Sequence, residues 1–181
     1  EVTTITHSYS YINFGVTKAE TNLADEHYVF FNGNEQPRVV SLEGVVMQPS
    51  ATALVCHAAS SVASLEGCAV STSNLSFNGN DAVALRCDFG APVPATLDVI
   101  GVVGENPGKS GWEVSGGNTR NGTLRRACDV ATGDDRFVPE QWAAADADDL
   151  SDLGHFTPCD GEPVECRQGE DILGADAGGS E

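Results

Sequence analysis

Short β-branched and aromatic runs, each ended by turn-forming residues, most constrain how this 181-residue chain can fold. One run covers 28–31 and is followed by Asn32-Gly33-Asn34, and another covers 51–56 and follows Pro49. Further runs cover residues 4–12, 38–46, 75–77, 82–87, 96–103 and 123–128. Many short runs at spacings of roughly 8–12 residues, with little helical periodicity, are typical of antiparallel sandwiches and barrels. The expected fold class is therefore all-β.

Two segments depart from this pattern. Residues 58–67 place Val62 and Leu65 on one helical face before Gly67, so we expect one short helix there. Beyond Cys166 the chain has few apolar residues, which indicates an irregular C-terminal extension.

A hairpin is predicted over residues 75–85. Asn78-Gly79 is a favoured two-residue turn, because glycine accepts the positive φ that such turns require. Apolar residues flank it on both sides and can line one buried face. The same turn geometry accounts for three side chains that otherwise resemble cation ligands: Asn78, Asn80 and Asp81.

The chain has six cysteines, and no two of them have C-x-x-C spacing. This pattern favours disulfide bonds over a zinc site. We expect the pairs Cys56–Cys68, Cys87–Cys128 and Cys159–Cys166. Each such bond contributes about 2–4 kcal/mol to the free energy of unfolding.

Disulfides indicate an oxidising compartment, so we expect a secreted or cell-surface protein. The first residues lack the basic and apolar regions of a signal peptide, and the expected form is a mature chain without its signal. Asn74 and Asn121 begin N-glycosylation patterns. No apolar run approaches the roughly 20 residues that span a bilayer, so direct membrane insertion is not expected.

Acidic residues outnumber basic ones by 27 to 9, which gives a net charge of −18. A nucleic-acid binder needs a cationic surface, so nucleic acid is excluded as a partner. The acidic surface has two interpretations: it is solvated and keeps the chain dispersed in salt, or it binds divalent cations.

The densest acidic cluster gives calcium as the candidate cation, with the ligands Asp146, Asp148, Asp149 and Asp152. An EF-hand that began at Asp146 would need Gly and Glu where Ser151 and Thr157 stand. Two interpretations of this segment remain. It is either an irregular calcium-binding loop or a solvated acidic loop that Trp142 and Leu153 anchor to the core.

No recognised catalytic motif occurs, because the serine-hydrolase elbow, the P-loop and H-E-x-x-H are all absent. His155, Cys159 and Cys166 have metal-ligand side chains, but oxidised cysteines do not ligate zinc. We expect a protein that is not an enzyme and has no cofactor other than the calcium alternative.

Arginines gather between positions 86 and 136, where they could form an anion site or salt bridges. Arg125 and Arg126 are adjacent on a strand and point to opposite faces, so salt bridges to carboxylates such as Asp98 or Asp81 are favoured. Trp112 and Trp142 could form a sugar-binding platform if exposed, but core positions are favoured.

Residues 39–153 resemble a lamin tail domain of the secreted bacterial and algal type. The resemblance rests on Ser41-Leu42-Glu43-Gly44, 53–57, 75–85, 97–108 with Gly111-Trp112, 123–126 and 137–142. It implies an immunoglobulin-like antiparallel β-sandwich. The family's usual Glu-Leu-Tyr-Asn-like opening strand pair is absent, so residues 1–38 either replace it or leave an edge for another chain. Residues 154–181 form the disulfide-containing tail.

Lamin tail domains commonly accompany secreted hydrolases or surface proteins, which implies a non-catalytic extracellular module. Such a module binds other extracellular proteins, copies of itself or glycans, or forms part of a surface assembly. The alternative is an accessory domain of a secreted hydrolase with a calcium-binding acidic loop.

Overall fold

The computed structural model describes residues 2–6, 11–15, 21–22, 27–32, 38–47, 51–60, 67–75, 77–87, 93–130, 132–147, 149–151 and 153–154. Its elements are β1 (Val2–Thr6), β2 (Tyr11–Gly15), β3 (Thr21–Asn22), β4 (His27–Asn32), β5 (Arg38–Ser41), β6 (Val46–Met47), β7 (Thr52–His57), β8 (Cys68–Thr72), β9 (Ala82–Cys87), β10 (Ala95–Ile100), β11 (Glu113–Val114), β12 (Gly117–Asn118), β13 (Thr123–Arg126), the 3-10 turn η2 (Pro139–Gln141) and β14 (Trp142–Ala145). The expected all-β class is confirmed.

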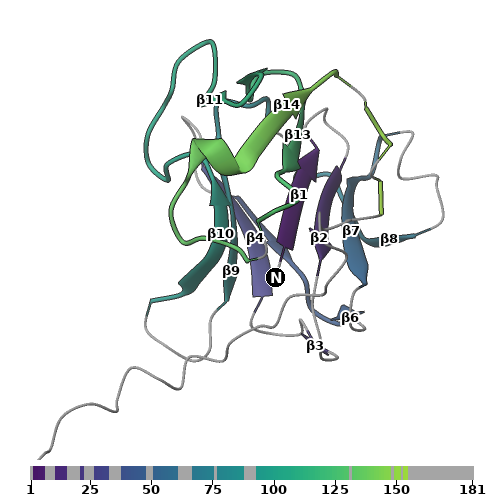
Figure 1. The fold of residues 1–181 in the computed structure, drawn as a ribbon. Helices are drawn as coiled ribbons and strands as arrows, with labels where there is room; N and C mark the ends of the chain where they lie inside the picture. Colours follow the sequence, from purple (N-terminus) through teal and green to yellow (C-terminus); the bar gives the residue numbers. More distant parts are fainter. Residues whose placement is uncertain are drawn as a thin grey trace, which may run out of the picture.

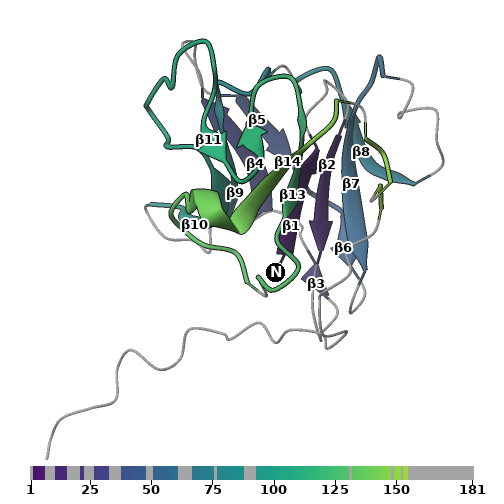
Figure 2. The ribbon, with the colours of Figure 1, turned by 45° about the horizontal axis from the view of Figure 1, so that its top comes forward.

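Two four-stranded sheets form the body of the protein (Figures 1 and 2). The first has the strand order β1-β2-β7-β8 and the second has the order β10-β9-β4-β5. Three two-stranded ladders join β3 to β6, β11 to β12 and β13 to β14. Strand β13 lies alongside β1, so the β13–β14 ladder continues the layer of the first sheet. Among the described residues, no helix is long and apolar enough to span a membrane.

The N-terminal strands belong to both sheets. β2 pairs with β7 from Tyr11↔Cys56 to Gly15↔Thr52. β4 lies between β5 and β9 and pairs with both. The first 38 residues therefore supply strands on which both sheets depend.

The parallel pairing of β7 with β8 was not expected from the sequence. The predicted helix over 58–67 falls here. Residues 58–60 form a turn in which the Ser60 N–H donates to the His57 carbonyl at 2.9 Å, and residues 61–66 lie outside the described residues. The chain then returns as β8, which ends the first sheet.

The main core lies between the sheets and draws on both of them. Val55 of β7 comes from the first sheet, whereas Val40 of β5 and Leu85 of β9 come from the second. Trp142, at 1% exposure, is the largest fully buried side chain among the residues whose burial is described. Core and sheet positions are therefore filled by the short apolar runs of the sequence.

The predicted hairpin over 75–85 is wrong. Residues 75 and 77–81 form no strand, because both sides of β9 are already occupied by β4 and β10. Leu75 and Phe77 are still buried in the core, at 1% and 2% exposure. The Asn78-Gly79 turn instead packs on the loop before β13, where the Thr119 hydroxyl donates to the Gly79 carbonyl.

Gly79 has no room for a side chain. Its φ is 94°, and a Cβ there would lie 2.0 Å from the Thr119 carbonyl oxygen. The Thr119 hydroxyl also accepts a hydrogen bond from the Trp112 N–H at 2.9 Å. Three loops thus meet at Thr119, and glycine is required by close approach as well as by backbone conformation.

Candidate functional site: a disulfide-pinned strand edge

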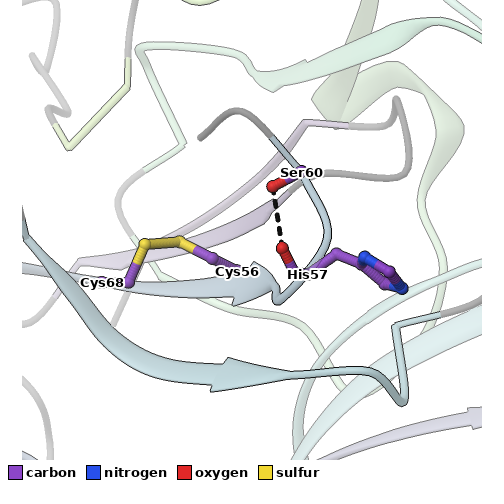
Figure 3. Close-up of a disulfide and its surroundings, with 4 residues drawn as sticks. All are labelled: Cys56, His57, Ser60 and Cys68. Carbon is purple, nitrogen blue, oxygen red and sulfur yellow. Dashed lines mark hydrogen bonds between the residues drawn. A yellow bond between two sulfur atoms is a disulfide. The ribbon is translucent and has the colours of Figure 1, made fainter. Parts of the chain in front are cut away.

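A disulfide joins Cys56 of β7 to Cys68 of β8, with 5.9 Å between the Cα atoms (Figure 3). The predicted pairing of these two residues is confirmed. The close-up shows the bond lying along the pair of strands, with the His57 ring directed away from it. The Ser60 hydroxyl donates to the His57 carbonyl at 2.8 Å, and the Ala59 N–H donates to His57 Nδ1 at 3.1 Å. Covalent and hydrogen bonds therefore fix the start of the connection between the two strands.

The predicted Cys87–Cys128 bond is wrong. Cys87 is a buried thiol at the end of β9, with 0% exposure. Cys128, in an exposed turn after β13, is disulfide-bonded, but not to Cys87, which keeps its thiol. The third predicted pair, Cys159–Cys166, lies outside the described residues.

Strand β8 ends the first sheet and has the sequence Cys-Ala-Val-Ser-Thr. It contains no charged residue and no proline, although charged residues make up 20% of the whole chain. Natural edge strands are commonly protected by charges, prolines or bulges. Exposed Ala69 and Ser71 alternate with partly buried neighbours, including β-branched Val70 and Thr72. This strand was not predicted from the sequence.

The other three sheet ends differ from β8. β1 is flanked by β13. β10 has a register shift between Thr96 and Asp98, a bulge that disrupts further pairing. β5 has only four residues and begins with exposed Arg38. The β7–β8 ladder also has a register shift, because Leu54 pairs with Cys68 and Val55 with Val70. Among the described strands, β8 is thus the sheet end that has neither a flanking strand nor a charged residue.

The backbone direction of β8 follows from one hydrogen bond. The Ala58 N–H donates to the Thr72 carbonyl at 2.9 Å, on the side of β7. Because the backbone groups of successive strand residues point to alternate sides, those of Ser71 face the outer edge. Ala69 is the extra residue at the register shift of the ladder, and its side chain is exposed. Within the described strands, no partner pairs there.

The face of β7 opposite the main core is covered as well. Leu54 and Cys56 form a small second cluster with Cys68 and Leu153. The Thr52 hydroxyl donates to the Gly154 carbonyl and holds this part of the chain on β7. Since β7 is packed on both faces, it is a rigid neighbour that holds β8 in position.

The structure places the candidate calcium ligands in different settings. Asp148 and Asp152 lie outside the described residues, and Asp146 is exposed. Asp149 accepts from Arg125 Nη2 at 2.7 Å and from the Ser151 hydroxyl at 2.8 Å. Among the described side chains, no three His, Cys, Asp or Glu residues could hold a metal ion together.

These contacts lower the pKa of Asp149 below its ordinary value of 3.8. The hydroxyl and N–H of Ser151 contribute most, and Arg125 adds a smaller effect of the same sign. The carboxylate thus serves as a tether between β13 and the segment that leads to Leu153.

Arg126, next to Arg125, points the other way and is buried. Its Nη1 donates to both oxygens of Asp98, at 2.7 and 2.8 Å, and its Nη2 donates to Gln141 Oε1 at 2.8 Å. The guanidinium stacks on Trp142, with Cζ 4.4 Å from the ring centroid. The predicted salt bridge to Asp98 and the opposite directions of the two arginines are confirmed.

Burial lowers the pKa of Arg126, and the carboxylates of Asp98 and Asp134 oppose that shift. An arginine remains charged under these conditions, so the pair is an internal ion pair. Asp98 also accepts N–H groups from Val99 at 3.0 Å and from Asp134 at 3.2 Å. This arrangement is structural, because both terminal nitrogens of Arg126 and both oxygens of Asp98 are bonded within the fold, although the buried Arg126 Nε has no hydrogen-bond partner.

The two tryptophans do not form an exposed platform together. Trp142 is 1% exposed, and Trp112 is partly buried with its ring edge-on to Phe137, 5.8 Å between centroids. The favoured core position is confirmed for Trp142. Asn74 and Asn121, the predicted glycosylation sites, are both exposed.

Comparison of the chain with protein-family models, curated proteins and solved structures gave no match.

Proposed function

We propose that this chain is a non-catalytic extracellular interaction module that binds protein partners by strand addition at the outer edge of β8. The observation that carries the proposal is the uncharged, disulfide-pinned edge of β8. Strand addition uses main-chain hydrogen bonds for affinity and alternate side-chain positions for specificity. The backbone of Ser71 offers the main-chain groups, and the exposed side chains of Ala69 and Ser71 offer the alternate positions.

The scaffold in this proposal is an immunoglobulin-like sandwich of the lamin-tail kind. Its support is that the sequence segments of the resemblance supply much of the core, including Leu42, Val55, Leu85, Ile100 and Trp142. Two four-stranded sheets with a shared core are in keeping with it. In this view the N-terminal strands β1, β2 and β4 take the place of the family's opening strands.

Secretion is part of the same proposal. The disulfides at Cys56–Cys68 and Cys128 support an oxidising compartment. A preorganised edge suits such a module, because a strand already held in place loses little conformational entropy when a partner binds.

A second copy of the chain is the first partner to test, since two β8 strands can pair across a twofold axis. The net charge of −18 repels copies from each other, so association should strengthen as salt screens that repulsion. Sedimentation velocity at several protein and salt concentrations measures this. A synthetic peptide with the sequence of residues 67–73 probes the edge directly in a fluorescence-anisotropy titration.

Two substitutions block the edge by different means. Ser71→Pro removes an outward N–H, and Ala69→Lys places a charge on the edge. Either should weaken self-association or peptide binding by about tenfold or more, which corresponds to about 1.4 kcal/mol. Val39→Lys on β5, where Val39 is 50% exposed, is the matched control and should leave binding unchanged.

A chain that stays monomeric at every concentration and ionic strength, and also fails to bind the peptide, would overturn the proposal. Equal effects of Ala69→Lys and Val39→Lys would place the contact elsewhere and count against β8. Circular dichroism and thermal unfolding of each variant verify that the fold is retained.

A further inference from the structure

The turn between β12 and β13 presents an Asn-Gly pair to solvent. Asn121 is exposed and has a φ of 51°, the one positive φ among the described non-glycine residues. Its N–H donates to the Asn78 carbonyl over a long 3.4 Å. Within the part of the chain that the structure describes, no hydrogen bond holds its side-chain amide. The amide group is therefore available for reaction.

An Asn-Gly pair carries its own nucleophile. The backbone nitrogen of Gly122 can attack Cγ of Asn121, which forms a C–N bond in a five-membered succinimide and releases the side-chain nitrogen as ammonia. Water then opens the ring at either carbonyl and leaves aspartate or isoaspartate. The nitrogen of Gly122 is accessible to Cγ because glycine has no side chain beside it. No oxidant, reductant or enzyme is needed for this sequence of steps.

Another Asn-Gly pair, Asn78-Gly79, is held in place by burial and by hydrogen bonds. Gly79 is buried, and a Cβ built there would lie 2.0 Å from the Thr119 carbonyl oxygen. Its carbonyl accepts from the Thr119 hydroxyl. The Asn78 amide oxygen accepts from the Asn80 N–H at 3.4 Å, and the Asn78 N–H donates to Asp81 at 3.2 Å. The peptide that would have to rotate is thus clamped.

We propose that Asn121 is a site of spontaneous succinimide formation in the folded protein, and that Asn78 is protected from the same reaction by Thr119. The product adds a negative charge at position 121. In its isoaspartate form it also lengthens the backbone by one methylene group two residues before buried Thr123, which pairs with Ala145. A glycan on Asn121 would block the reaction, because the sugar occupies the amide nitrogen that must leave.

The experiment uses the full-length oxidised chain without glycans, incubated in mildly alkaline buffer made with ¹⁸O-water. Peptide mapping by mass spectrometry then measures ¹⁸O incorporation and isoaspartate at each Asn-Gly pair. Conversion at Asn121 should be at least about tenfold faster than at Asn78, which corresponds to about 1.4 kcal/mol of local opening at the clamped site. The same chain, reduced and unfolded in denaturant, is the control, and there Asn78 and Asn121 should react at similar rates.

Gly122→Ala tests the chemistry itself. A Cβ at position 122 meets nothing closer than the Ala145 carbonyl oxygen at 3.3 Å, so the variant should fold. It should slow conversion at Asn121 by about tenfold, because the added methyl group hinders the approach of nitrogen to carbon. Equal rates at Asn78 and Asn121 in the folded chain would overturn the proposal. So would a rate difference that persists unchanged after unfolding, because the fold would then not be its cause.

Discussion

Arg126 of β13 donates from Nη1 to both carboxylate oxygens of Asp98 on β10, at 2.7 and 2.8 Å, with both side chains almost fully buried. The pair connects two sheets, because β10 belongs to the second sheet and β13 lies beside β1 of the first. Stacking of the guanidinium on Trp142 joins this link to the main core.

Asp98→Ala should lower the free energy of unfolding by about 3–5 kcal/mol, because it leaves a buried guanidinium without its carboxylate. Urea denaturation followed by circular dichroism measures the loss. Asp135→Ala is the matched control: its contact with Arg136 is 3.8 Å long and exposed, and such pairs contribute less than about 1 kcal/mol. Similar losses in the two variants would contradict a special role for the buried pair.

Gly79→Ala should destabilise the protein more than Gly104→Ala. The two glycines have similar φ values, 94° and 88°, so both variants bear the left-handed backbone cost of about 1–2 kcal/mol. Only at Gly79 does the new methyl group collide with backbone, while nothing lies within 4 Å at Gly104. The collision should add about 1–3 kcal/mol, measurable as a lower urea midpoint.

Replacing both Cys56 and Cys68 with alanine should lower the free energy of unfolding by about 2–4 kcal/mol. In hydrogen exchange, the β8 amides should lose more protection than the β9 amides. The reason is that β8 is held only by β7 and by the disulfide, whereas β9 has a neighbour on each side. Cys87→Ala is the control, since it removes a buried thiol and no disulfide. A β8 as well protected as β9 in the double variant would contradict the pinning role.

Acid should remove the contribution that the Asp149 carboxylate makes to the free energy of unfolding. Its pKa is lower in the folded chain, so the carboxylate stabilises the fold above its ordinary pKa of 3.8 and loses this effect as the pH falls through the folded value. Asp149→Asn should therefore be less stable than the parent at neutral pH and equally stable in strong acid. Thermal unfolding across this pH range tests it, and a difference that persists in acid would point to another cause.

Strands with strong local signals could be predicted from the sequence, and β9 matches its predicted range of 82–87. β7 is also close to its predicted run, because it is apolar on both faces. The hairpin at Asn78-Gly79 could not be excluded locally. Its failure depends on β4, which arrives from far along the chain and fills the side of β9 opposite β10.

For the candidate site, the opposite directions of Arg125 and Arg126 favoured salt bridges but left Asp98 and Asp81 open, and the structure gives Asp98 for Arg126. Cys56–Cys68 was one of three expected disulfides and is present. The β8 edge itself could not be predicted. Its parallel partner requires a crossover, and the alternation in a five-residue strand is too short to distinguish an edge from an interior position.

The place of β4 between β5 and β9 has a consequence for how the protein forms during synthesis. β2 pairs with β7, and β4 pairs with β9, so the first sheet cannot be complete before Thr72 has been synthesised, nor the second before Ile100. Contacts between positions that are distant in sequence make folding slow. Until β7 and β9 are available, β2 and β4 can pair with wrong partners. The Cys56–Cys68 loop spans a sequence separation of only 12 residues, so its closure is entropically easy and can precede the long-range pairing. Oxidation can therefore hold β8 beside β7 before β2 pairs with β7.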